Sequence, residues 1–213
     1  MKAMKIKAIF FDMDGVLIEA KDWHYESLNK SLALFGLNIS RYDHLVTFDG
    51  LPTRKKLEML SVERGLPSEL HEFINDLKQR YTQEIVQQKC KPLFIHERAL
   101  SHLHSMGYKM AVCSNSVRES VELMMQKASL SQYLELMISN EDVSKGKPSP
   151  EMYNNAIDHF ELLPKECLIL EDNPNGIKAA KESGANLMVI NEVSDVNIEA
   201  ILKRITEIEN EEI

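Results

Sequence analysis

Five short apolar runs recur along the chain, and they constrain its fold more than any other feature of the sequence. The runs are residues 5–11, 109–114, 136–139, 167–170 and 186–190. Each is mostly apolar, which is typical of a buried strand in a parallel sheet. Patterns with helical spacing lie between the later runs. Strands that alternate with helices predict a parallel sheet covered by helices on both faces.

Helices are predicted around these strands by apolar residues spaced three and four positions apart. Three of them span residues 97–106, 116–128 and 175–183, and a fourth begins at Pro150, because proline is favoured at the first helical position. Gly184 ends the last of these, as glycine commonly does. The expected fold class is therefore α/β with a Rossmann-like parallel sheet.

The stretch from residue 20 to residue 91 differs from the rest, because only helical patterns occur in it. A first pattern ends at Gly36. Thr53 is expected to cap a second helix that stops at Gly65. Ser68 is expected to cap a longer third helix. These patterns predict a small helical bundle inserted after the first strand.

The length of 213 residues fits one α/β core with a smaller inserted unit. We therefore expect a catalytic core made of residues 1–19 and 92–213. Residues 20–91 are expected to form an inserted α-helical cap domain. The acidic stretch 207–212 is expected to be solvated.

Composition narrows the function classes. Hydrophobic residues make up 44% and charged residues 27%, as in ordinary globular proteins. The formal net charge of −8 argues against nucleic-acid or anionic-membrane partners, which would require a basic surface. Cys90, Cys113 and Cys167 form no CxxC pair and are expected to be reduced thiols, the last two buried in strands. A signal peptide is not expected, because the first residues lack a basic segment followed by an apolar one, and no apolar run approaches the roughly 20 residues that span a bilayer. We expect a cytoplasmic protein that is a monomer.

The first strand ends in Phe11-Asp12-Met13-Asp14-Gly15. Positions two apart on a strand face the same way, so Asp12 and Asp14 are expected to bring two carboxylates together at the carboxyl end of the strand. Carboxylates this close repel each other unless a cation or a shared proton relieves them. By itself the motif is also compatible with a plain turn. A calcium loop fits less well, because its later acidic ligands are absent here.

Three later segments place polar groups at the same edge of the predicted sheet. Ser114 and Asn115 follow the second strand where a helix begins, and the start of a helix favours phosphate. Lys147 lies in a proline-bounded loop before another helix. The fourth strand ends in Glu171 and Asp172, hard oxygen ligands that suit magnesium. Taken alone, the Ser114 segment is also compatible with a plain helix cap, and the Lys147 segment with a solvated turn.

These motifs, in this order, resemble the haloacid dehalogenase superfamily of phosphotransferases. The resemblance rests on DxDGVL, a serine at the end of a strand, a lysine in a KPSPExY run and an EDN segment. The inserted helical segment is similar to the cap of the β-phosphoglucomutase-like branch. The resemblance extends from Lys5 to about Val193. Each motif is common by itself, but the four together in this order are specific.

The resemblance implies a role for each motif residue. Asp12 would attack phosphorus and become an aspartyl-phosphate, and Asp14 would protonate the leaving oxygen and then activate water. Ser114 and the backbone amide of Asn115 would hold the phosphoryl oxygens. Lys147 would offset the negative charge of nucleophile and phosphate. The implied magnesium ligands are Asp12, the backbone carbonyl of Asp14, Asp172 and, directly or through water, Glu171.

Three residues of the cap are candidates for substrate binding. His24 follows Asp12 by twelve residues, and at this spacing similar mutases use a histidine to couple the cap to the acid/base. A partly exposed helix histidine is an equal alternative. Gly50 and Arg54 resemble the cap loop of the family, a glycine turn followed by a cationic helix start. In the mutase pattern the arginine follows the glycine by three residues, whereas here it follows by four, which puts a second phosphate site in doubt. Arg54, Lys55 and Lys56 could still form such a site, although a cationic helix face is usually only solvated.

We expect a magnesium-dependent phosphatase that hydrolyses a small phosphorylated metabolite, such as a sugar phosphate, through an aspartyl-phosphate intermediate. A sugar phosphomutase of the β-phosphoglucomutase type is the alternative. A 2-haloacid dehalogenase is not expected, because halide displacement leaves no oxygen to protonate and that branch lacks an aspartate equivalent to Asp14. A catalytically silent binding protein would be expected to have lost Asp12, Asp14 or Asp172, and all three are present.

Overall fold

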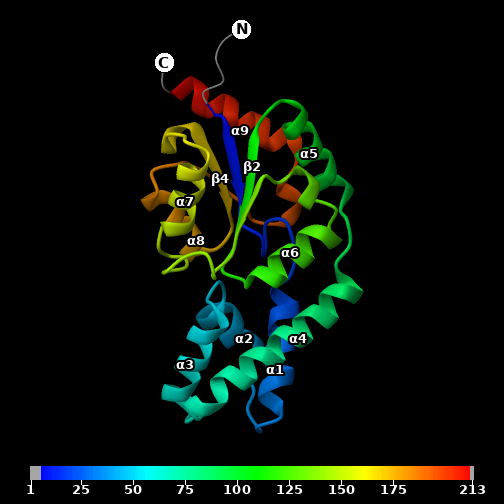
Figure 1. The fold of residues 1–213 in the computed structure, drawn as a ribbon, viewed down its shortest axis with the longest axis vertical. Coiled ribbons are helices and arrows are strands. Elements are labelled where there is room, and N and C mark those ends of the chain that lie inside the picture. Colours follow the sequence, from blue (N-terminus) through cyan, green and yellow to red (C-terminus); the bar gives the residue numbers. More distant parts are fainter. Residues whose placement is uncertain (1–5, 212–213) are drawn as a thin grey trace.

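The computed structural model describes residues 6–211 and contains a five-stranded parallel sheet (Figure 1). The strand order is β3-β2-β1-β4-β5. The strands are β1 Ala8–Phe11, β2 Lys109–Cys113, β3 Leu136–Ile138, β4 Cys167–Glu171 and β5 Asn186–Val189. All five predicted strands are present, although Lys5, placed in the first of them, lies outside the described residues. The predicted α/β fold class is confirmed.

Helices cover both faces of the sheet, as the apolar runs predicted. In β1, Ile9 and Phe11 point into one apolar cluster and Ala8 and Phe10 into the other, because successive strand residues alternate. All four side chains are fully buried. The first face is covered by α5 Phe94–Ser105, α6 Arg118–Lys127 and α9 Ile198–Glu211, the second by α7 Glu151–His159 and α8 Pro174–Glu182. Short 3₁₀ turns lie at Ser131–Tyr133, Pro164–Glu166 and Val193–Asp195.

The last helix, α9, was not predicted from the sequence. Ile201, Ile205 and Ile208 recur at helical spacing and pack into the first apolar cluster, so the helix covers one face of the sheet. The acidic stretch expected to be solvated therefore belongs, as far as residue 211, to a helix with one buried face. Glu212 lies outside the described residues.

Residues 21–89 contain helices and turns but no strand. They form α1 Lys21–Ala33, α2 Arg41–Asp43, a π-helical turn His44–Phe48, α3 Thr53–Arg64, a 3₁₀ turn Ser68–Leu70 and α4 His71–Lys89. An apolar cluster of their own, which includes Leu28, Phe48, Leu57 and Ile74, holds these helices together. Figure 1 shows them beyond the carboxyl ends of the strands, with α1 and α4 side by side.

Three predicted helix starts are wrong in detail. Pro52, and not Thr53, is the N-cap of α3, so Thr53 is already helical. Ser68 begins a 3₁₀ turn, and Leu70 is the N-cap of α4. Pro150 is the N-cap of α7 and not its first helical residue. Helix starts differ by one or two residues more easily than the helices themselves, because the first turn lacks intrahelical acceptors for its N–H groups.

The three cysteines are buried and free, as expected for Cys113 and Cys167 within strands. Within residues 6–211, none of the helices has the length and hydrophobicity needed to cross a bilayer.

Candidate active site

The sheet brings the predicted motifs together because β1 is its central strand. Asp12 follows β1 directly, and β2 and β4 run parallel on either side of it. Ser114 therefore follows one neighbour of β1, and Asp172 follows the other. The chain places β2 and β3 on one side of β1 and then β4 and β5 on the other. Where the strand order reverses in this way, the carboxyl ends of the strands border a crevice in which parallel sheets bind ligands. A pocket at this edge is lined by both core and cap residues.

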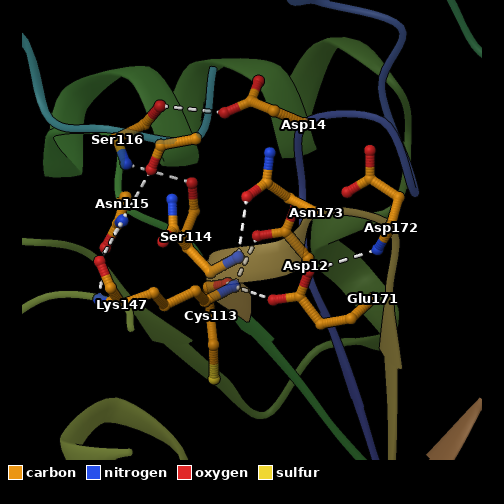
Figure 2. A network of polar contacts seen from close by, with 12 residues as sticks. Asp12, Asp14, Cys113, Ser114, Asn115, Ser116, Lys147, Glu171, Asp172 and Asn173 are labelled. Atoms are coloured by element: carbon orange, nitrogen blue, oxygen red, sulfur yellow. Dashed lines mark hydrogen bonds and ion pairs between the residues drawn. The ribbon is translucent and has the colours of Figure 1, made fainter. Parts of the chain in front are cut away.

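The side chain of Lys147 contacts residues at the ends of three strands. Its Nζ lies 2.6 Å from Oδ1 of Asp12 and 2.5 Å from Oε1 of Glu171, and donates to the carbonyl oxygen of Cys113 at 2.8 Å (Figure 2). The side chain is 4% exposed. Burial by itself would lower the pKa of Lys147, but the charges of Asp12 and Glu171 raise it above its ordinary value. The lysine is therefore a fixed positive charge beside the predicted nucleophile.

Glu171 has a second partner that the sequence did not suggest. The hydroxyl of Tyr153 donates to Oε1 of Glu171 at 2.5 Å, and both side chains are buried. With Lys147 and Tyr153 on one oxygen, Glu171 is held in a fixed position.

The carboxylates at this edge carry more negative charge than Lys147 neutralises. Burial raises the pKa of Asp12 well above its ordinary value, and Glu171, Asp14 and Asp172 raise it further, whereas Lys147 opposes them. A nucleophilic carboxylate must be ionised. An additional cation at this edge would lower the pKa of Asp12 and so favour the form that can attack.

The donor set at this edge fits a divalent cation. Oxygen atoms of Asp12, Glu171 and Asp172 lie within 4.8 Å of one another. Oδ2 of Asp172 pairs with Nζ of Lys21 at 2.8 Å, but its Oδ1 is buried and has no hydrogen-bond partner in the part of the chain that the structure describes. An unpartnered buried carboxylate oxygen beside two more carboxylates suits a hard cation with oxygen ligands. The side chain of Asp14 is not part of this group.

Asp14 belongs to a separate hydrogen-bonded chain. Its Oδ2 accepts from the hydroxyl of Ser116, and its Oδ1 lies 3.0 Å from Nε2 of His24. Nδ1 of His24 lies 3.3 Å from Nζ of Lys78. An ionised Asp14 can only accept, so the proton of a neutral imidazole lies on Nε2 and His24 donates to Asp14.

The two carboxylates of the DxD motif therefore have different protonation. Burial would raise the pKa of Asp14, but His24 and Ser116 lower it below its ordinary value. Burial lowers the pKa of His24. In this arrangement Asp14 is an ionised base that contacts a neutral histidine at neutral pH.

Ser114 and Asn115 line the same pocket as Asp12, and the Asn115 side chain also connects two loops. Its Nδ2 donates to the carbonyl of Gly50 at 2.9 Å and to that of Lys147 at 3.1 Å, and its Oδ1 accepts from the Lys147 amide. The side chain therefore ties the cap loop to the lysine loop. Its backbone N–H donates to no other group among residues 6–211, so it is available to a ligand.

Gly50 lines the pocket, and two observations show why glycine stands there. Its φ is +69°, a left-handed conformation that favours glycine. A Cβ at this position would lie 2.6 Å from Oδ1 of Asn173. The cap loop therefore approaches the core more closely than a residue with a Cβ atom would allow.

Arg54 does not line this pocket. Its side chain is 88% exposed and lies 3.7 Å from Glu58 on the outer face of α3. Lys56 lines the pocket instead. Residues two apart on an α-helix point about 200° apart around its axis, so Arg54 and Lys56 cannot both face the pocket. The prediction of Arg54 as the residue at the pocket is therefore wrong, and Lys56, another member of this cationic run, takes that position.

Comparison with known families shows the family to which the chain belongs. A model of the family described as haloacid dehalogenase-like hydrolase matches residues 9–190. The chain belongs to this family. The predicted resemblance is confirmed over most of the chain.

Known haloacid dehalogenase-like hydrolases are similar to the chain along most of their length. The phosphorylated carbohydrates phosphatase of Thermotoga maritima is 24% identical over 182 residues, covering 84% of this chain and 82% of its own. The pyrophosphatase PpaX of Anoxybacillus flavithermus is 27% identical over 181 residues, covering 85% and 81%. These relatives confirm the predicted enzyme class, a phosphatase of the haloacid dehalogenase type.

Solved structures support the fold. β-Phosphoglucomutase from Clostridium difficile superposes with a TM-score of 0.82 at 18% identity, covering 95% of this chain and 98% of its own. The phosphate complex of CbbY from Rhodobacter sphaeroides gives a TM-score of 0.79 at 21% identity, covering 86% and 85%. At these identities the likeness concerns the fold alone.

Within this haloacid dehalogenase-like hydrolase, sequence reasoning missed the polar residues that come from distant segments. Ser116 and Lys78 act on Asp14 and His24 from 102 and 54 residues away. One signal was present, because Lys78 stands four residues after buried Ile74, on the apolar stripe of α4. A lysine inside such a stripe is unusual and indicates a buried charge.

Proposed function

We propose that the chain is a magnesium-dependent phosphatase that hydrolyses a small phosphorylated metabolite through an aspartyl-phosphate on Asp12. The observation that supports this best is the environment of Asp12, a buried carboxylate with Lys147 at 2.6 Å and Asp172 and Glu171 beside it. A carboxylate can approach an anionic phosphate only where positive charge offsets the repulsion.

In the first step an oxygen of Asp12 attacks phosphorus, and the bond from phosphorus to the leaving oxygen breaks. Ser114 and the Asn115 amide hold the phosphoryl oxygens, and Lys147 stabilises the charge that moves onto them. Magnesium bound by Asp12, Asp172 and Glu171, with the carbonyl of Asp14, would supply further positive charge to these oxygens.

Asp14 moves the protons of both steps. To protonate the leaving oxygen it must first take up a proton, and a phosphate placed beside it favours this, because nearby negative charge raises the pKa of a carboxyl. In the second step, ionised Asp14 takes a proton from water, the water oxygen bonds to phosphorus, and the bond to Asp12 breaks. His24 and Ser116, which favour ionised Asp14, suit this second step.

A phosphomutase is less well supported by the cap. Thr53 stands three residues after Gly50, where the mutase pattern has arginine, and Arg54 is turned away from the pocket. The relatives from Thermotoga and Anoxybacillus are named as phosphatases of phosphorylated carbohydrates and pyrophosphate. We therefore propose hydrolysis, with water as the acceptor of the phosphoryl group.

The test is turnover of p-nitrophenyl phosphate with magnesium by the wild-type protein and by Asp12→Asn. The amide keeps the shape of the carboxylate but removes the attacking charge, so we expect turnover to fall by about a thousandfold or more. Asp158→Asn, an exposed change on α7, is the matched control and should keep full activity. Near-normal turnover by Asp12→Asn, with the fold intact, would refute the proposed nucleophile.

A further inference from the structure

Two lysines of the cap face the pocket without an anionic partner. Lys56 of α3 is 7% exposed and Lys78 of α4 is 6% exposed, and both line the pocket. No carboxylate among residues 6–211 lies within 4.0 Å of either ammonium group. The one hydrogen-bond contact that the described structure gives Lys78 through its Nζ is with Nδ1 of His24.

Burying an ammonium group without an anionic partner disfavours its charged form, and the pKa values of both lysines are lowered accordingly. Burial lowers the pKa of Lys56 to about 8 and, together with the charge of Lys56, that of Lys78 to about 7. Lys147 is equally buried, yet two carboxylates raise its pKa. The cap lysines therefore lack the compensation that this fold gives its other buried lysine.

The carboxylates nearest to these lysines already have other partners. Asp14 accepts hydrogen bonds from Ser116 and His24. Asp49 accepts from Asn173 at 2.9 Å and lies 3.7 Å from Lys21. The positive charge of the cap lysines is therefore left to face the pocket.

The position of this charge indicates which part of a substrate it meets. The transferring phosphoryl group is accounted for by Asp12, Lys147 and the Ser114 segment of the core. Lys78 lies on the other side of His24 from Asp14, toward the cap, and Asp14 is the group proposed to protonate the leaving oxygen. The cap lysines therefore face the leaving group.

A third group in the same wall can accept a hydrogen bond, because burial lowers the pKa of His44 to about 4 and the single proton of its neutral ring lies on the nitrogen that faces a carbonyl. His44 lines the pocket, its Nδ1 is buried, and no described residue hydrogen-bonds to that atom. Its other ring nitrogen lies 3.1 Å from the carbonyl of Lys21. Such an unpartnered buried acceptor indicates a ligand group that donates a hydrogen bond, in addition to any anionic group that the lysines bind.

We propose that Lys56 and Lys78 form an anion subsite, and that the physiological substrate carries a second anionic group, a carboxylate or a phosphate, on its leaving group. This proposal rests on the proposed phosphatase function. The cavity volume is about 70 Å³, and a buried water needs roughly 10–15 Å³ on this scale, so the leaving group is compact.

The experiment compares phosphate esters that differ in the second charge. One pair is 2-phosphoglycolate against 2-hydroxyethyl phosphate, which tests a carboxylate. The other pair is 1,2-ethanediol bisphosphate against 2-hydroxyethyl phosphate, which tests a phosphate on an equally compact leaving group. For each pair we would measure kcat/KM with magnesium, and in parallel the affinity for the Asp12→Asn protein, which binds without turnover.

In at least one pair we expect the doubly charged ester to be preferred by tenfold to a hundredfold, about the effect of one charge-assisted contact. Lys56→Met should reduce this preference toward one in both turnover and affinity. The matched control is Lys55→Met, the next residue of α3, which is exposed and lies near Glu58; it should keep the preference.

The two proposals fail in different ways. Equal treatment of both members in both pairs, or a preference that Lys56→Met leaves unchanged, would refute the anion subsite even if all esters are hydrolysed. Tight, Lys56-dependent binding of a doubly charged ester with no hydrolysis of any ester would refute the phosphatase and support the subsite. A preference in only one pair would identify the anion as carboxylate or phosphate.

Discussion

Asp12 and Asp14 are two residues apart, yet their contacts shift their pKa values in opposite directions. Burial and the neighbouring carboxylates raise the pKa of Asp12, whereas His24 and Ser116 lower that of Asp14. Pairs of titratable groups with opposite shifts are common where one group attacks and the other moves protons. The two roles proposed for the DxD motif therefore follow from its surroundings and not from its residue types, which are the same.

Removing the hydroxyl of Ser116 should change the pH dependence of the second step. Because the hydrogen bond from Ser116 lowers the pKa of Asp14, Ser116→Ala should raise that pKa. The acid limb of kcat for p-nitrophenyl phosphate, whose leaving group needs no proton, should then move to higher pH. Ser116→Thr keeps a hydroxyl and should restore the wild-type limb. An unchanged limb in Ser116→Ala would show that Asp14 is not the base.

Lys56 should make the stability of the protein depend on pH. Its pKa is about 8 in the folded state and near the ordinary 10.5 when unfolded, so the cost of burying its charge is fully present below pH 8 and is relieved as the pH rises toward 10.5. Lys56→Met should therefore raise the free energy of unfolding at pH 7, by on the order of 3 kcal/mol at most. Urea unfolding at pH 7 and pH 10 should show this gain shrinking at the higher pH. A less stable variant at pH 7 would contradict the prediction.

At the scale of elements, the start of α3 decides which cations of the cap reach the pocket. The turn at Gly50 and the N-cap Pro52 fix the rotation of the helix, with Lys56 inward and Arg54 outward. The carbonyl of Gly50 is also held by Asn115 of the core. The loop before α3 therefore sets both the identity of the pocket lysine and the closeness of cap to core.

Two glycines with the same backbone conformation distinguish the cost of a left-handed backbone from the effect of the close approach between cap and core. Gly50 and Gly36 have φ of +69° and +70°, so alanine should destabilise either position by about 1 kcal/mol. A Cβ at Gly36 would meet nothing within 4 Å, whereas one at Gly50 would collide with Asn173. We expect Gly50→Ala to lower kcat/KM by about tenfold or more, because a loop displacement of about 1 Å can cost a hundredfold. Gly36→Ala should keep full activity at temperatures well below unfolding, and equal losses in both would show that the close approach at Gly50 is unimportant.

At the scale of the molecule, helices α1–α4 and the sheet enclose a pocket that neither forms by itself. At the pocket the contacts that join them are polar: His24 with Asp14, Lys21 with Asp172, Asn115 with Gly50 and Asn173 with Asp49. Away from the pocket, Trp23 of α1 and Val86 of α4 pack into the first apolar cluster of the core. A substrate that pairs with the cap lysines and with the core would add to this set. Binding energy from the leaving group would then be used to close the pocket over the reacting phosphate.

Magnesium should stabilise the whole fold, because it would relieve the repulsion among Asp12, Glu171 and Asp172. At a hundred times its dissociation constant, a ligand that binds only the folded state adds about 2.7 kcal/mol. Thermal unfolding should therefore move to higher temperature with magnesium and return with a chelator. Asp172→Asn should abolish the shift, and Asp158→Asn should keep it. No shift in the wild-type protein, at magnesium concentrations that support full activity, would contradict this assignment of the site.

The sequence by itself determined the sheet and the chemistry of its edge. Five strands were recognisable because continuous apolar runs separated by helical periodicity have few other solutions. The edge strands β3 and β5 are only partly buried, in contrast to the expectation of burial on both faces. Asp12, Ser114 and Asp172 each follow a strand directly, so a parallel sheet must bring them to one edge. These features depend on neighbours along the chain, which a sequence records.

Only the tertiary structure decided the contacts between residues that are far apart in the sequence. Lys78 reaches His24 across 54 positions, and Ser116 reaches Asp14 across 102, so no local spacing predicts either pair. The choice of Lys56 over Arg54 depended on the rotation of α3, which one residue at its start changes by about 100°. Helix rotation and long-range packing are set by the whole apolar core, and for that reason the cap side of the pocket could not be read from its own segment.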